Sequence, residues 1–152
     1  MYDPTAKQIT DAVVHALKTQ RMDLELALKL ICRAEEAART IHVPMVLSVV
    51  DEGGNLVAFH RMDDSLLASI SISQAKAYTA AALRISTAEA AQQILPGKPL
   101  YGLQQTHPGQ FCLFGGGEPV TVNGRCIGGL GISGGTAEQD AAVAHTAVTV
   151  DV

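Results

Sequence analysis

Apolar residues recur at helical spacing in the first 44 residues, and the spacing then changes to that of strands. Asp3 followed by Pro4 is typical of a helix start and predicts a helix over about residues 4–19. Asp23 can cap a second helix, whose apolar positions are Leu24, Ala27, Leu28, Ile31, Ala34, Ala38 and Ile41. Pro44 prevents this second helix from continuing.

Two β-branched and apolar runs follow, at residues 45–51 and 55–62. The glycines between them, Gly53 and Gly54, predict that the two runs form a hairpin. An Ala-rich run at residues 73–84 then favours a helix, although the alternating SISIS before it obscures where that helix begins.

Capping and turn signals divide the rest of the chain. A capping box at residues 86–89 predicts a short helix that ends near Pro96, and another at residues 136–139 predicts a final helix. Residues 123–124, Asn-Gly, are typical of a type I′ turn between strands. Three strands are predicted, at residues 111–114, 119–122 and 125–133.

The predicted order of elements is ααββααβββα. Short turns make neighbouring strands antiparallel, and the helices can cover the sheet. The sequence therefore predicts an α+β fold with a five-stranded antiparallel sheet. The sequence contains neither a linker nor an internal repeat, so residues 1–152 are interpreted as one domain.

Composition excludes several classes of function. The chain has 152 residues, of which 47% are hydrophobic and 17% charged, as in globular proteins. The net charge is −4 and no run of Lys or Arg occurs, so nucleic acid is not expected as a partner. No apolar stretch approaches the ~20 residues of a membrane span. Three widely spaced cysteines favour reduced thiols in a cytoplasmic protein.

The glycines near the end of the chain match a dinucleotide-binding fingerprint, Gly129-x-Gly131-x-x-Gly134. That fold needs a second parallel strand after the helix, and here the strands come as hairpins. Nucleotide binding is therefore not predicted. Two interpretations of the glycines remain: tight packing of sheet against helix, or a smooth surface for a planar ligand or a second subunit.

Several long motifs resemble the GlcG/HbpS family, in order over residues 24–147: VLSVVDEGGNLVAFHRMDD, KAYTAAAL, PGKPLYGLQ, FGGGEPV and IGGLGISGGTAEQD. The closest resemblance is to its diol-utilisation branch, with OrfY-like proteins and the C-terminal domain of the PduO-type cobalamin adenosyltransferase. It implies a profilin- or PAS-like sheet of five strands, symmetric homo-oligomers such as octamers, and non-covalent binding of haem b. Adenosyl transfer would belong to a separate N-terminal domain, so this chain is not expected to be an enzyme.

The resemblance further implies a redox-sensing or accessory role in cobalamin-dependent propanediol utilisation, in the cytoplasm or a bacterial microcompartment. For the haem iron we predict His15 as axial ligand, because it is one position off the apolar stripe of the first helix. A second subunit could donate the other axial histidine. Lys18 and Arg21 are the candidate partners of the haem propionates. His42, His60, His107 and His145 are interpreted as surface or packed residues.

A polar cluster gives a competing site. Asp51, Arg61, Asp63 and Lys76 match recurrent polar positions of the family motif, and could orient a small aldehyde or diol or tune a general base. We favour a structural role for them, because no nucleophile–base pair accompanies the cluster. A purely structural assembly domain is the third alternative.

Overall fold

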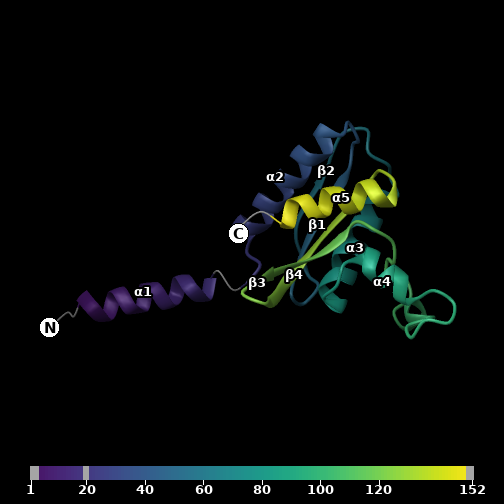
Figure 1. Ribbon diagram of the computed structural model, residues 1–152. Coiled ribbons are helices and arrows are strands. Elements are labelled where there is room, and N and C mark those ends of the chain that lie inside the picture. Colours follow the sequence, from purple (N-terminus) through teal and green to yellow (C-terminus); the bar gives the residue numbers. More distant parts are fainter. Residues whose placement is uncertain (1–3, 19–20, 150–152) are drawn as a thin grey trace.

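The computed structural model describes residues 4–18 and 21–149 (Figure 1). Their elements are, in chain order, α1 (Pro4–Lys18), α2 (Leu24–Thr40), β1 (Val46–Asp51), β2 (Leu56–Arg61), α3 (Ser69–Leu83), α4 (Thr87–Gln93), the 3₁₀ helix η1 (Leu103–Thr106), β3 (Gly117–Val122), β4 (Arg125–Ser133) and α5 (Ala137–Val148). Asp3 and Thr19, the predicted cap and end of the first helix, lie outside the described residues.

The four strands form one sheet in the order β2-β1-β4-β3, and every neighbouring pair is antiparallel. Helices α2 and α5 pack against each other and on one face of the sheet, whereas α3 packs on the opposite face (Figure 1). The α+β class and the antiparallel sheet are therefore confirmed. The turn between β3 and β4 is as predicted, since Asn123 and Gly124 both have positive φ, 51° and 77°.

The prediction of five strands is wrong, because residues 111–114 are not a strand. This segment runs beside α3 instead of joining the sheet. The backbone N–H of Cys112 donates to the side-chain oxygen of Thr79 on α3, at 2.9 Å. The Thr79 hydroxyl thus accepts the backbone hydrogen bond that, in a sheet, a neighbouring strand would accept.

The two faces of the sheet differ in residue size. On β1 and β4, Leu47, Val49, Leu130 and Ile132 belong to the main apolar core with α2 and α5. The alternating positions, which point to the other face, include the small residues Ser48, Gly129, Gly131 and Ser133, besides Val46 and Val50. The serines are paired with serines of α3: Ser48 with Ser73 at 2.8 Å, and Ser133 with Ser69 at 3.0 Å.

The glycines of β4 allow α3 to lie directly on the sheet. A Cβ atom at Gly129 would overlap the carbonyl oxygen of Ala77, and one at Gly131 would overlap that of Ser73. Intramolecular packing therefore accounts for these glycines, and the alternative of a smooth surface for a planar ligand or second subunit is wrong. The SISIS run, residues 69–73, forms the first turns of α3 and is not a strand, and its small serines suit the close approach of this helix to the sheet.

Three of the predicted helix starts, at Asp23, Ser86 and Thr136, are confirmed. The carboxylate of Asp23 accepts a hydrogen bond from Leu26 N–H at 2.9 Å, and the Ser86 hydroxyl accepts from Glu89 N–H at 3.1 Å. Thr136 and Gln139 form a complete capping box at the start of α5. These local bonds satisfy backbone donors that a helix leaves free in its first turn.

Both edges of the sheet are irregular. On the β2 edge, the register against β1 shifts by one residue, which leaves Val57 as the extra residue of a bulge. On the β3 edge, Pro119 lies opposite Gly129 and has no backbone N–H. Neither edge strand therefore presents an uninterrupted row of backbone donors.

Candidate functional site

Helix α1 projects away from the sheet and the other helices (Figure 1). Every side chain described on it, over residues 5–16, is exposed. Ile9 and Val13 are one turn apart and keep 60% and 51% of their surface exposed. An apolar stripe without cover is unusual on a surface helix and indicates a partner or a ligand.

His15 lies on this helix with an exposed imidazole. Among the described residues, it forms neither a hydrogen bond nor an ion pair. Its ring nitrogens are therefore available to a ligand. The two predicted propionate partners lie near it along the chain: Lys18 is the last residue of α1, one turn after His15, and Arg21 is exposed. The side chain of Lys18 lies outside the described residues.

Two of the other histidines are engaged within the chain. His60 Nδ1 lies 2.7 Å from a carboxylate oxygen of Glu35. His107 Nδ1 lies 2.9 Å from the Thr106 hydroxyl, and its ring is 4.5 Å from that of Phe111. His42 and His145 are exposed, but each belongs to the body of the fold rather than to α1. His15 is thus the histidine that combines a free imidazole with a helix whose apolar side chains are uncovered.

The competing polar cluster does not assemble. Asp51 and Arg61 are at opposite ends of the β1–β2 hairpin, since Arg61 is paired with Val46. The Asp51 carboxylate accepts hydrogen bonds from the backbone N–H groups of Gly53 and Asn55 and so closes the turn. Neither Arg61 nor Asp63, both exposed, forms an ion pair within the described residues.

Lys76, the fourth member, is completely buried and forms an ion pair across the fold. Its ammonium donates to Asp140 Oδ2 on α5 at 2.7 Å and to the carbonyl oxygen of Ile132 on β4 at 2.9 Å. Asp140 Oδ1 also accepts a hydrogen bond from Gly135 N–H at 2.8 Å. The Lys76 ammonium lies 4.8 Å from the centre of the Phe114 ring. Lys76 therefore joins three elements and is not exposed to a substrate.

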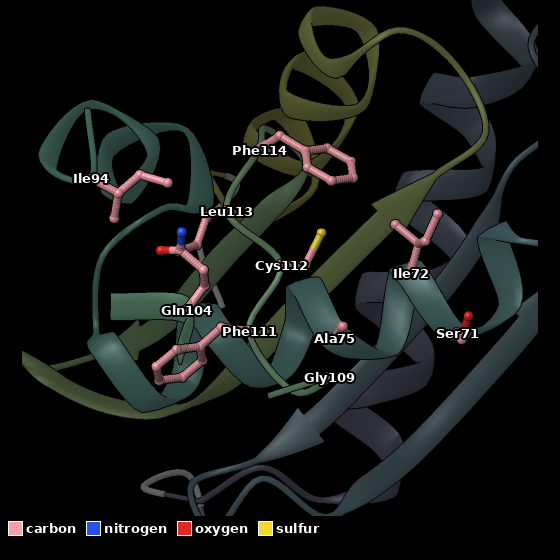
Figure 2. A pocket seen from close by; sticks show the side chains of 10 residues that line it. All are labelled: Ser71, Ile72, Ala75, Ile94, Gln104, Gly109, Phe111, Cys112, Leu113 and Phe114. Atoms are coloured by element: carbon pink, nitrogen blue, oxygen red, sulfur yellow. The ribbon is translucent and has the colours of Figure 1, made fainter. Parts of the chain in front are cut away.

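A pocket of about 470 Å³ lies between α3 and residues 94–114 (Figure 2). The sulfur of Cys112 points into it from the segment that was wrongly predicted to be a strand. No sequence motif around Cys112 indicates a role for it, and none could have revealed this pocket, because its walls are far apart in the sequence.

Glu118 on β3 has a raised pKa, because burial disfavours its charged form and Glu89 repels it, while His145 acts in the opposite direction. The folded state therefore binds the proton of Glu118 more tightly than the unfolded state does. The stability that protonated Glu118 contributes is fully present below the ordinary pKa of glutamate. We expect it to be lost as the pH rises through the higher pKa of the folded state. Glu118→Gln should accordingly raise the urea midpoint at pH 7 but not at pH 4.

The matched control is Glu36→Gln on α2, where the carboxylate is exposed. Its urea midpoint should follow that of the unmodified protein at both pH values. A Glu118→Gln protein that is less stable than the unmodified protein at pH 7 would contradict the proposed cost of burying this charge.

Residues 4–18 and 21–149 show neither a metal centre nor a membrane-spanning helix. No group of three or more His, Cys, Asp and Glu side chains in these ranges could hold a metal ion. None of their helices is both long and apolar enough to cross a membrane.

The fold defines a class of protein: an α+β domain with an antiparallel sheet between helices. The chain belongs to the HbpS-like family, described as "haem degrading protein HbpS-like", which matches residues 22–149. The resemblance to the GlcG/HbpS family is thereby confirmed. The matched residues begin after α1, so His15 lies outside the stretch that defines the family.

Relatives in sequence include an uncharacterized 15.0 kDa protein from the dhaT-dhaS intergenic region of Citrobacter freundii. It is 49% identical over 125 residues, which are 82% of this chain and 88% of that protein. The corrinoid adenosyltransferase PduO of Salmonella typhimurium is 44% identical over 115 residues, 76% of this chain but 34% of its own length. The chain therefore corresponds to about a third of that enzyme.

Among solved structures, the protein ORFY of Klebsiella pneumoniae has a TM-score of 0.81 at 42% identity, covering 85% of this chain and 89% of that chain. The crystal structure of a PduOC:heme complex has a TM-score of 0.80 at 40% identity, covering 84% and 93%.

Proposed function

We propose that this protein binds haem b non-covalently, with the His15 imidazole as an axial ligand of the iron. The observation that carries the proposal is the free imidazole of His15 on a helix whose apolar residues Ile9 and Val13 are uncovered. These residues fit the group, because haem needs a nitrogen donor for its iron and apolar contacts for its ring. The similarity to a PduOC:heme complex supports the same cofactor.

Assembly of two copies completes the site in this proposal. One α1 offers one imidazole, so His15 of a second copy supplies the other axial position. Lys18 and Arg21 supply the positive charges that the propionates need. Lys18 is three residues after His15, at the end of α1. The uncovered apolar stripe of α1 is then buried between the copies, as a homo-oligomer such as an octamer would allow.

The cofactor supplies one-electron redox chemistry when bound. The His15 imidazoles of two copies would hold the haem, and a haem held by two imidazoles would favour sensing or electron transfer over an enzymatic role. Similarity to a corrinoid adenosyltransferase supports an accessory role in cobalamin-dependent diol utilisation, in the cytoplasm or a microcompartment. Adenosyl transfer would belong to the part of that relative that this chain does not match.

A hemin titration followed by absorbance tests the proposal. The unmodified protein should show a saturable Soret band with low-spin features, and His15→Ala should weaken binding by about tenfold or more, since an axial bond is lost. Light scattering should show a larger assembly when hemin is bound, because the ligand joins α1 of two copies.

His42→Ala is the matched control, because His42 is also exposed but lies outside α1. This variant should bind hemin with the affinity of the unmodified protein. Unchanged binding by His15→Ala would transfer the axial role to another histidine. Absence of saturable binding in the unmodified protein would overturn the haem proposal.

A further inference from the structure

The pocket beside α3 is shaped by residues that haem binding at α1 does not use. Ten of the described residues line it, and Figure 2 shows them on α3, at the end of α4 (Ile94), on η1 (Gln104) and on residues 109–114. Ile72 and Ala75 belong to α3, whereas Phe111, Cys112 and Phe114 belong to the last segment. Its volume of about 470 Å³ is within the range of about 300–1,000 Å³ that is usual for small-molecule sites.

The pocket has an apolar part next to the thiol. In Figure 2 the sulfur of Cys112 lies between Phe114 and Ile72, on the side of the segment that faces away from Ile94. The backbone N–H of Cys112 is held by the Thr79 hydroxyl at 2.9 Å, so this position is fixed against α3. Burial raises the pKa of the Cys112 thiol more strongly than the Lys76 charge lowers it, and the thiol is therefore neutral at pH 7.

None of the ten lining residues is charged. The Lys76 ammonium, 4.8 Å from the centre of the Phe114 ring, is already neutralised by Asp140 at 2.7 Å. An anionic ligand would thus lose its hydration without gaining a counter-ion. The polar groups that line the pocket are uncharged side chains, the Ser71 hydroxyl and the Gln104 amide, besides the thiol.

We propose that this pocket is a second binding site, for an uncharged small molecule that carries an aromatic ring and one hydrogen-bonding group. The ring lies between Phe114 and Ile72, above the Cys112 sulfur, where an aromatic partner gains both apolar burial and a ring contact. The Ser71 hydroxyl, which lies on the Ile72 side of residues 109–114 and can both donate and accept, binds the polar group. Because no described side chain of α1 lines this pocket, the site is separate from the proposed haem site.

Binding can be measured with 1-aminoanthracene, an uncharged fluorescent aromatic amine, and the full-length protein. Displacement by 2-naphthol but not by the anion 2-naphthoate is expected, because the pocket is uncharged. Ala75→Leu fills the floor of the pocket with a good helix former and should weaken binding by about tenfold or more. Ala88→Leu on α4 makes the same change at an exposed position and should leave binding unchanged.

Protection of the thiol locates the ligand in the unmodified protein. Saturating 1-aminoanthracene should slow alkylation of Cys112 by N-ethylmaleimide, measured by peptide mass spectrometry, and leave the exposed Cys32 unaffected. Equal alkylation rates of Cys112 with and without the probe would overturn the proposal, as would wild-type affinity in Ala75→Leu. Ala75→Leu should still bind hemin, so the failure of one site is distinguishable from failure of the other.

Discussion

Replacing Lys76 by methionine is expected to lower the free energy of unfolding by about 3–5 kcal/mol, the usual cost of removing one partner of a buried ion pair. Methionine has a similar length and retains contact with the Phe114 ring, so little volume is lost. The loss comes from Asp140, which is 2% exposed and would keep the Gly135 N–H as hydrogen-bond donor but lose its counter-ion. Urea denaturation followed by circular dichroism measures the change.

The double variant Lys76→Met/Asp140→Asn separates loss of charge balance from loss of packing. The amide oxygen of asparagine can still accept from Gly135, while no charge remains buried, so most of the lost stability should return. If the free energy of unfolding of Lys76→Met were within about 1 kcal/mol of that of the unmodified protein, the ion pair would contribute little to stability. A role for Lys76 other than stabilising the fold would then have to be considered.

Gly131→Ala is expected to destabilise the fold by about 3 kcal/mol or more, beyond the usual range for overpacking. A Cβ at this position meets the backbone of α3 at Ser73 and Ala77, and backbone atoms cannot move aside as the end of a flexible side chain can. Either α3 shifts along its whole length or the sheet bends. Urea denaturation and the yield of folded protein both measure the outcome.

Gly53→Ala provides the comparison, because the nearest atom to its added Cβ is the side-chain nitrogen of Asn55, at 2.9 Å. That side chain can rotate, so the expected loss is within about 1 kcal/mol. If Gly131→Ala were as stable as Gly53→Ala, the close approach of α3 to β4 would not be what requires glycine there.

Signals between residues close in sequence predicted most of the secondary structure. The caps at Asp23, Ser86 and Thr136 and the turn at residues 123–124 depend on hydrogen bonds or backbone angles within four residues, so the sequence contains all of their physics. The hairpins and the α+β class followed from the same signals.

Features that depend on distant partners were not predictable in this way. Residues 111–114 have the composition of a strand, but Thr79 on α3 binds their backbone. The partner of Lys76 is Asp140, 64 residues later. The sequence instead grouped Lys76 with Arg61 and Asp63, which are nearer in the chain but exposed. For His15, the sequence predicted the helix and the stripe, and the structure adds that both are uncovered. Its role as an iron ligand stays a prediction.

The irregular edges of the sheet also bear on how copies of this chain can associate. A regular edge strand would invite another chain to continue the sheet, which is the first step toward fibrils. Here the bulge at Val57 twists one edge away, and Pro119 interrupts the donors of the other. The folded protein is therefore a poor template for amyloid growth, and the homo-oligomer proposed above would form through its helices, as a closed assembly of fixed size, rather than by continuing the sheet.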